Sequence, residues 1–223
     1  MTGIREIGGG RFDAFYHSRY FNALEKSIEN SPYQKSKLRD HISTIAYGAS
    51  VSNNYVETGI PLLRIKDLKR NEINVEEVVC LPESEKENLG SCFLKKNDFL
   101  ISRSGTIGVV SIVPKDVDGF AFGSFMIKFS LKQNAEVIRE FLSYYLNSSL
   151  MARLIERNKI GAIQGNITIP AIKNFPIVLP NLEKQNEIAL HISEIRRKAK
   201  GLQAESNKIL EDAKREIEKM ILG

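Results

Sequence analysis

The chain has 223 residues and a mass of 25.2 kDa, which is enough for one or two domains with a buried core. Hydrophobic residues make up 42% and charged residues 26%, and these ordinary globular values exclude a wholly disordered or fibrous protein. The net charge of +5 and the pI of about 9.1 make the chain mildly basic. This is compatible with a nucleic-acid partner but is not diagnostic of one.

Two features favour a cytoplasmic protein without a membrane partner. The only cysteines, Cys80 and Cys92, form neither a metal-type pair nor a disulfide framework, which favours a reducing compartment. The start of the chain, MTGIREIGGGRF, lacks the apolar core of a signal peptide, and no uninterrupted apolar stretch approaches membrane-spanning length.

The first part of the chain predicts short elements. Residues 19–30 are expected to form a helix, because Leu24 and Ile28 lie four apart and the turn signal NSP follows. From residue 38 to about residue 131, glycine, asparagine and proline separate runs of β-favouring residues. These runs predict a compact, strand-rich body, and they span residues 60–65, 75–81, 98–102, 109–113 and 121–129.

The last of these runs alternates in part, with Phe125, Ile127 and Phe129 on one side and Ser124, Met126 and Lys128 on the other. A helix is predicted next, with Asn134 as its N-cap and apolar residues at helical spacing up to residue 155. Residues 161–182 contain two glycines and three prolines. We therefore expect loop and short strand there rather than helix.

The C-terminal segment has a heptad pattern. Between residues 182 and 222 there is no proline, and Gly201 is the only glycine. An apolar residue recurs every seven positions, and small or apolar residues lie between; together these positions are Ile188, Ile192, Ile195, Ala199, Leu202, Ser206, Ile209 and Ala213. This pattern, called the heptad seam below, is typical of a coiled coil. At 1.5 Å per residue, the helix would form a rod of about 50 Å.

We therefore predict an α+β protein with two parts. A strand-rich globular domain would span residues 1–180, and a long C-terminal coiled-coil helix would span residues 181–223. The alternative for the helix is that it folds back along its own domain. Residues 181–223 carry nine basic and eight acidic side chains, so most of the net charge lies in the globular part.

Catalytic and metal-binding motifs are missing from the sequence. It contains no phosphate-binding G-x-x-x-x-G-K-[ST], no G-x-G-x-x-G, no H-E-x-x-H and no G-x-S-x-G. The histidines His17, His41 and His191 are scattered and lack ligand-type neighbours. The residues therefore favour a binding protein without a metal site, and an enzyme with a dispersed active site remains an alternative.

Four stretches of the sequence carry a resemblance to a known family. They are RFDAFYHSRY (11–20), GIPLLRIKDL (59–68), KKNDFLISRSGTIGVVSIV (95–113) and GAIQGNITIPAIKNFPIVLPNLEKQNEIA (161–189). In this order they resemble the specificity subunits of type I restriction–modification systems. Those subunits usually carry two target recognition domains and two long helices, whereas this chain has one of each. It therefore resembles a half-length specificity subunit.

The resemblance implies a non-catalytic role in DNA recognition. Family members bind a bipartite sequence in double-stranded DNA, with one half-site for each recognition domain. They hold modification subunits that methylate adenine with S-adenosylmethionine, and restriction subunits that use ATP and magnesium join them. On this basis the chain itself would bind no cofactor.

Basic residues are the first candidates for the DNA-binding surface, because lysine and arginine supply most of the affinity for phosphates. A basic cluster of Arg64, Lys66, Lys69 and Arg70 precedes an acidic segment at residues 72–87. Such a polarised surface would orient a phosphate-rich ligand. A merely solvated charged surface explains the same residues nearly as well.

Loops supply the other candidates. In ISRSGTIG (101–108), Gly105 and Gly108 permit a tight loop that presents Arg103, Ser104 and Thr106, although such a loop is also a common hairpin turn. Residues 48–59 offer polar and aromatic groups for base edges or sugars, namely Asn53, Asn54 and Tyr55, but turn chemistry alone also accounts for them. Gln164 and Asn166 belong to the family-like motif, and they either contact DNA or fix the turn before the long helix.

The heptad seam predicts self-association. If two long helices hold two readers in the family, a single-helix chain would supply the second helix by forming a homodimer. Its two-fold symmetry would match an inverted repeat with a fixed spacer. The competing interpretation is a protein-interaction adapter that oligomerises through the same helix.

Overall fold

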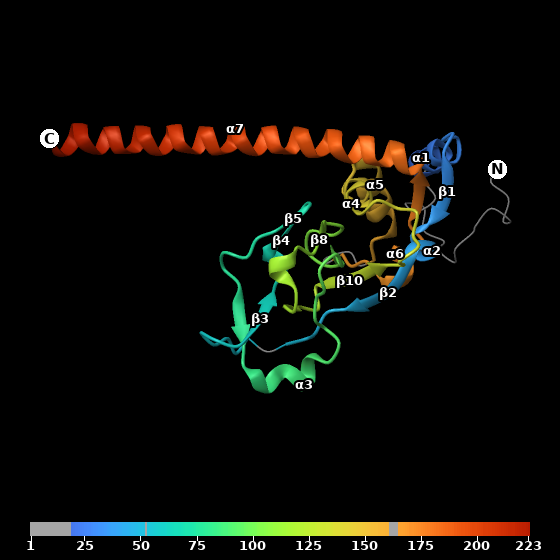
Figure 1. The fold of residues 1–223 in the computed structure, drawn as a ribbon, viewed down its shortest axis with the longest axis horizontal. Helices are drawn as coiled ribbons and strands as arrows, with labels where there is room; N and C mark the ends of the chain where they lie inside the picture. The colour runs from blue at the N-terminus through green and yellow to red at the C-terminus, as the bar shows by residue number, and fades with distance from the viewer. Residues whose placement is uncertain (1–18, 52, 161–164) are drawn as a thin grey trace.

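The computed structural model describes residues 19–51, 53–160 and 165–223 (Figure 1). A mixed body contains all the strands, and one long helix extends from it (Figure 1). The helices are α1 (Arg19–Glu29), α2 (Leu38–His41), α3 (Lys86–Leu89), α4 (Arg139–Leu146), α5 (Ser149–Asn158), α6 (Ile169–Lys173) and α7 (Leu182–Leu222). The strands are β1 (Gln34–Lys37), β2 (Ile42–Tyr47), β3 (Ile60–Leu63), β4 (Leu68–Lys69), β5 (Glu72–Ile73), β6 (Val79–Leu81), β7 (Phe99–Ser102), β8 (Val110–Ile112), β9 (Ala121–Phe122), β10 (Met126–Leu131) and β11 (Pro176–Leu179). The predicted α+β fold class, with a strand-rich part and a long C-terminal helix, is confirmed.

A four-stranded antiparallel sheet lies inside the body, in the order β2-β10-β7-β8. Its two central strands, β7 and β10, bury side chains on both faces. Ile127 belongs to a core cluster that also contains residues of α4 and α5, whereas Met126 belongs to a second cluster with β3 and β9 residues. The predicted alternation is therefore confirmed from Met126 to Phe129, and a core cluster lies on each face of β10. Phe125 precedes the strand and is 49% exposed.

A second, three-stranded sheet has the order β6-β3-β9, in which β3 and β9 are parallel. The predicted run 121–129 is split between the two sheets. The split occurs at a turn in which the Met126 N–H donates to the Gly123 carbonyl at 3.1 Å. The predicted strands at 60–65, 98–102 and 109–113 are confirmed as β3, β7 and β8 with trimmed ends, and only the end of 75–81 forms a strand, β6.

The helices after the sheet differ from the sequence expectation. Helix α4 begins at Arg139, not at a cap on Asn134. It ends at Leu146 with Asn147 as its C-cap, and Ser148 then caps α5 by accepting the Met151 N–H. The Asn147 amide donates to the Val110 carbonyl at 2.8 Å and accepts the Val110 N–H at 3.1 Å. A tertiary contact to β8 therefore stabilises the break between the two helices.

The segment before α7 contains a short helix that was not expected. Thr168 caps α6 by accepting the Ala171 N–H, and Pro170 occupies its first turn, where no backbone N–H is needed. The strand that follows, β11, pairs antiparallel with β1. This pairing places the start of α7 beside β1.

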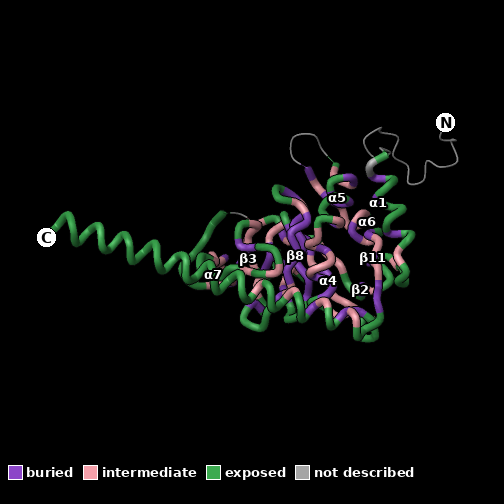
Figure 2. The backbone as a smooth tube through the Cα atoms, turned by 90° about the horizontal axis from the view of Figure 1, so that it is seen from above, coloured by how far each residue is buried: buried purple, intermediate pink, exposed green. Residues whose placement is uncertain are grey.

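Helix α7 starts where the sequence predicts, because the Asn181 side chain accepts the Lys184 N–H at 2.9 Å and caps it. Its first part lies along the body beside α4. From Gly201 onward every residue is exposed, and this part extends beyond the body as a free rod (Figure 2). At 1.5 Å per residue, residues 201–222 span about 33 Å. None of the described helices is both long and apolar enough to cross a membrane.

Candidate nucleic-acid interface

One edge of the four-stranded sheet gathers several candidate segments. Because neighbouring strands are antiparallel, the C-terminal ends of β2 and β7 lie at the same edge as the N-terminal ends of β10 and β8. The segments that leave the sheet at this edge are residues 48–59, 103–109 and 123–125. Two of the three contain sequence-predicted site residues.

A close backbone contact fixes the point where residues 48–59 leave the sheet. The Gly48 N–H donates to the Met126 carbonyl at 3.1 Å, and the Ala49 N–H donates to the Phe122 carbonyl at 3.0 Å. A Cβ atom on Gly48 would lie 2.2 Å from the Gly123 carbonyl oxygen. Only glycine fits at position 48 without displacing this contact.

Arg103 lies at this edge on an aromatic ring. Its guanidinium carbon is 4.7 Å from the centroid of the Tyr47 ring, a geometry that stabilises a cation on an aromatic face. The Arg103 N–H donates to the Phe125 carbonyl, and the Arg103 carbonyl accepts the Ile167 N–H, both at 2.9 Å. The Tyr47 hydroxyl accepts the Ile169 N–H at 3.2 Å. The Tyr47 ring thus holds the Arg103 side chain, and hydrogen bonds to Phe125 and Ile167 hold its backbone.

The neighbouring predicted residues take different positions. Ser104 is buried and forms a β-bridge with Asn166, whereas Thr106 is exposed. The loop is a tight turn, as predicted, with Gly105 and Gly108 at φ 71° and 81°. The structure therefore brings Arg103, Ser104 and Asn166 together and places the Ser104 side chain in the interior. Gln164 lies outside the described residues.

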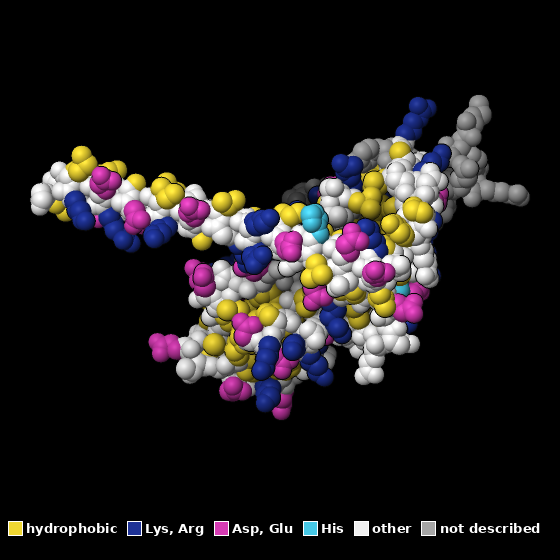
Figure 3. Space-filling view, turned by 45° about the horizontal axis from the view of Figure 1, so that its top comes forward, with side chains coloured by type: hydrophobic (Ala, Val, Ile, Leu, Met, Phe, Trp, Pro, Cys, Tyr) yellow, Lys and Arg dark blue, Asp and Glu magenta, His cyan; other side chains and the backbone are white. Residues whose placement is uncertain are grey.

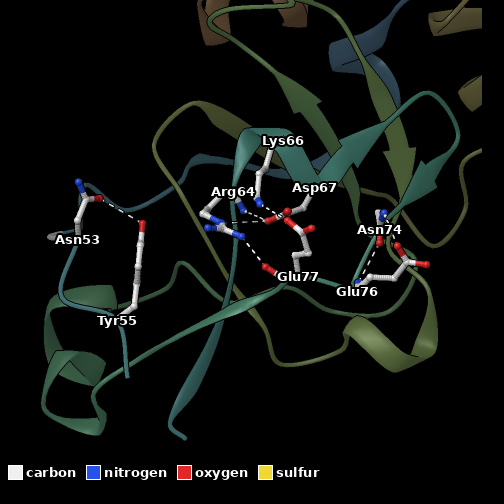
Figure 4. Close-up of polar contacts among 8 residues, drawn as sticks. All are labelled: Asn53, Tyr55, Arg64, Lys66, Asp67, Asn74, Glu76 and Glu77. Atoms are coloured by element: carbon white, nitrogen blue, oxygen red, sulfur yellow. Dashed lines mark hydrogen bonds and ion pairs between the residues drawn. The ribbon is translucent and has the colours of Figure 1, made fainter. Parts of the chain in front are cut away.

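Arg64 belongs to a second cluster, at the end of β3 (Figure 4). Its Nε is 3.4 Å from Asp67 Oδ2, and its terminal amino group donates to the Glu77 carbonyl. The guanidinium carbon lies 5.8 Å from the centroid of the Tyr55 ring. Arg64 is thus engaged by acceptors of its own chain.

The other members of this cluster are paired as well (Figure 4). The Lys66 ammonium lies 2.5 Å from Glu77 Oε2, and this hydrogen bond lowers the pKa of the Glu77 carboxyl. The Tyr55 hydroxyl donates to Asn53 Oδ1 at 3.2 Å. Asn53, Asn54 and Tyr55 are exposed. The basic cluster and the acidic segment, treated as separate in the sequence, are therefore interleaved.

Lys69 and Arg70 lie on the β4–β5 hairpin, which packs against α7. The Arg70 carbonyl accepts a hydrogen bond from Arg196 at 3.2 Å, and Lys200 lies 2.7 Å from Glu72. At the hairpin turn, Asn71 has φ 58°, and its side-chain oxygen accepts from Ser143 at 2.8 Å and from Asn147 at 3.0 Å. The hairpin thus joins the basic segment to α4 and α7.

Sequence reasoning did not select two residues that hold this region together. Tyr47 carries the stack on Arg103, and its only sequence signal was its place just before the loop at 48–59. Gln185 is 1% exposed at the start of α7. Its amide accepts the Ile138 N–H at 2.9 Å and donates to the carbonyls of Pro180 and Glu136 at 2.8 and 3.1 Å. The Glu-x-Gln that opens the helix was the available signal.

The heptad seam is covered only at its start. Ile188 packs against the first core cluster, and Ile192 is half-buried. The next seam residues are open, with Ile195 52%, Leu202 67% and Ile209 62% exposed. Ala199 and Ala213 are exposed as well. Figure 3 shows hydrophobic side chains along the free part of the rod, with lysine, arginine and acidic side chains beside them.

The shifted pKa values occur at structural positions. Burial raises the pKa of Tyr145 to about 12, and its hydroxyl donates to the Pro176 carbonyl at 3.0 Å. Burial also raises the pKa of the Cys92 thiol and lowers that of His41. No group of three or more potential metal-ligating side chains occurs among the described residues.

The sequence of this chain is similar to known proteins. A family model described as the type I restriction modification DNA specificity domain matches residues 30–211. The chain is 21% identical over 166 residues to the type I restriction enzyme EcoBI specificity subunit of Escherichia coli, covering 74% of this chain and 35% of that protein. It is 28% identical over 178 residues to the MjaVIII specificity subunit of Methanocaldococcus jannaschii, covering 76% of this chain and 40% of that protein.

A solved structure shares the fold. The type I restriction–modification S subunit from M. genitalium matches with a TM-score of 0.55 and 18% identity, over 78% of this chain and 42% of that one. The chain thus spans well under half the length of each of these relatives. The family model nevertheless covers the strand-rich body and much of α7. This chain therefore belongs to the type I restriction–modification DNA specificity family.

Proposed function

We propose that this chain is a DNA reader that performs no chemistry itself. It recognises one half-site of a bipartite double-stranded DNA target, associates as a homodimer through α7, and positions modification and restriction subunits. S-adenosylmethionine, ATP and magnesium are used by those partner subunits, and this chain binds none of them.

The observation that carries the DNA-binding part is the convergence of segments at one sheet edge. Arg103, Tyr47 and Asn166 come from three distant parts of the chain and meet where residues 48–59 leave the sheet. A rigid sheet with polar and basic loops at one edge is a suitable scaffold for contacts to phosphates and base edges. Membership of a DNA specificity family supports the same assignment.

Within this surface the residues divide by role. Exposed groups in the loops, such as Asn53, Asn54 and Thr106, are available to base edges or sugars. Lys69 and Arg70 add positive charge near α7 and contribute affinity rather than sequence preference. Ser104 maintains the turn from the interior.

The homodimer follows from the uncovered seam. Leu202 and Ile209 are more than half exposed, on a stretch of helix (residues 201–222) in which every residue is exposed and no other described segment packs. Burying such side chains against a second copy removes apolar surface from water. The two-fold axis of this dimer would present two identical readers in opposite directions. The expected target is an inverted repeat with a fixed spacer.

Co-expression with a modification subunit tests this proposal. Methylated adenines would be mapped across the genome of a host that carries both chains and of a host that carries the modification subunit alone. We expect methylation at one inverted-repeat motif only when both chains are present. Methylation that is independent of this chain, or no sequence preference in the purified complex, would contradict it.

The adapter hypothesis predicts a different result. A specificity subunit should bind its duplex with an affinity that falls steeply as salt rises while its preference over random duplex persists. An adapter should show neither. Sedimentation tests dimerisation independently of DNA recognition. A strict monomer at micromolar concentration would contradict the homodimer, and the methylation map would then decide whether the chain recognises DNA.

A further inference from the structure

Arg64 and Arg103 differ in what their guanidinium groups contact. Arg64 is bound by Asp67 and by the Glu77 carbonyl. Arg103 has no ion pair and no side-chain hydrogen bond among the described residues, and its Nε is buried without an acceptor. An arginine without an acceptor inside its own protein leaves donors for a ligand.

The exposed part of Arg103 is its terminal fork. The residue as a whole is only partly buried, and Nε is the only buried side-chain nitrogen or oxygen without a partner among the described residues. The two terminal amino groups also have no partner there, and neither is among the fully buried atoms. The guanidinium therefore keeps a planar pair of unpaired N–H donors at the sheet edge.

This fork is held in place before any ligand arrives. The guanidinium lies 4.7 Å from the centroid of the Tyr47 ring. Tyr47 pairs with Ile127 in the sheet and accepts the Ile169 N–H through its hydroxyl. The Arg103 backbone is hydrogen-bonded on both sides, to Phe125 and Ile167. A side chain fixed in this way loses less conformational entropy on binding.

The chemistry of the fork selects its ligand. A guanidinium donates in parallel to two adjacent acceptors, and DNA offers two such pairs: O6 and N7 of guanine in the major groove, and two oxygens of a phosphate. A lysine at this position could supply charge but not the planar fork.

We propose that Arg103, stacked on Tyr47, is a preformed donor fork for an adjacent acceptor pair on DNA, and that Arg64 instead fastens the β3 end to residues 67 and 77. This inference rests on the proposed function. It separates two arginines that the sequence treats as equivalent.

The test uses the full chain in complex with its modification subunit and a labelled duplex that carries the mapped methylation motif. Arg103→Ala should weaken binding at least tenfold while the melting temperature of the complex stays unchanged. Arg64→Ala should lower the melting temperature and affect DNA binding less than threefold at a temperature where the complex is folded. Binding of Arg103→Ala within twofold of wild type would overturn the inference.

Arg103→Lys distinguishes the two acceptor sources. If the fork binds a phosphate, lysine should restore most of the affinity, and Arg103→Ala should reduce the salt slope by about one and weaken all duplexes equally. If it reads guanine, lysine should restore little, the salt slope should hold, and preference at one guanine of the motif should relax.

Tyr47 variants keep the inference testable if Arg103→Ala fails to fold. Tyr47→Phe retains the ring and should bind DNA as wild type, whereas Tyr47→Leu loses the stack and should bind at least threefold more weakly. Wild-type binding by both Tyr47→Leu and Arg103→Lys would overturn the inference. If the wild-type complex prefers no duplex, the proposed function fails; if it is specific and the variants match it, only the role of Arg103 fails.

Discussion

Residues 182–200 and 201–222 of α7 belong to one unbroken helix with one heptad pattern, yet their surroundings differ. The first part, called the docked half here, buries Gln185 and Ala189 and pairs Arg196 and Lys200 with the β4–β5 hairpin. The second part, the free half, exposes every residue. Within one periodic pattern, the docked half therefore fixes the helix to the body and the free half leaves an apolar surface exposed.

The two halves differ in the kind of residue that determines their contacts. A polar amide, Gln185, anchors the docked half because it satisfies three backbone groups between α7 and the segment before α4. The free half carries apolar residues, such as Leu202 and Ile209, that meet only solvent. Hydrogen bonds within the chain thus anchor the docked half, whereas the free half presents an apolar surface that suits an apolar partner.

The largest expected effect on the free energy of unfolding comes from Gln185. Gln185→Ala would leave the Ile138 N–H and two carbonyls without partners and should lower the free energy of unfolding by about 2–4 kcal/mol. Gln203→Ala, in the free half, removes only a contact to Asn207 and should cost less than about 0.5 kcal/mol. Urea unfolding followed by circular dichroism measures both. Equal effects would erase the distinction between the two halves.

The free half should dominate association instead. Ile209→Asp places a charge in the seam and should weaken the dimer by about 2 kcal/mol, or roughly 30-fold in dissociation constant. The melting temperature of a dilute, monomeric sample should stay unchanged, because Ile209 does not contact the body. Sedimentation velocity across a concentration series measures the first effect and calorimetry the second. A variant that dimerises normally would place the interface elsewhere.

A smaller effect is expected at the hairpin contact. Lys200→Met removes the exposed ion pair to Glu72, which lies at a distance of 2.7 Å. Exposed pairs contribute about 0–1 kcal/mol, so stability should change by less than about 1 kcal/mol and the change should vanish in high salt. Lys214→Met, which breaks a pair within the free half, is the matched control. A large loss would show that the hairpin contact anchors α7 as firmly as Gln185 does.

The smallest expected effect is a pH dependence near the anchor. His41 lines the cleft beside Pro180 and Gln185, lies 2.7 Å from the Ser36 hydroxyl, and has a pKa lowered by burial. Because the unfolded chain takes up the proton first, stability should fall as pH drops through about 6.5. His41→Gln should reduce the difference in unfolding midpoint between pH 7.5 and pH 5.5. An unchanged difference would assign the pH dependence to other groups.

Local signals predicted much of the fold. The absence of proline after residue 180 and the heptads indicated the start and length of α7, and turn residues around β3, β7 and β8 indicated their positions. The break at Asn147 was not predictable, because it depends on a contact to Val110, which is distant in sequence. Burial of Met126 similarly depends on a second core cluster that only the folded chain assembles.

The candidate site was predictable in its residue types but not in its pairings. The sequence grouped Arg64 and Lys66 as free positive charge, yet folding brings Glu77 beside both. Arg103 was identified from its glycine-containing loop. Its stacking partner Tyr47 lies at the end of β2, and the sequence does not indicate that the two side chains meet. The DNA contacts themselves remain predictions for the variants described above.

The backbone contact between Gly48 and Gly123 sets a limit on how this surface can diversify. Since no side chain fits at position 48, exchange of recognition segments should succeed when the graft begins after Ala49 and ends before Ile60, because both boundaries then lie in buried backbone that the scaffold keeps. Swapped loops that carry a larger residue at position 48 should unfold the sheet edge rather than acquire a new preference. Gly48 thus separates what can be varied at this sheet edge from what must be inherited unchanged.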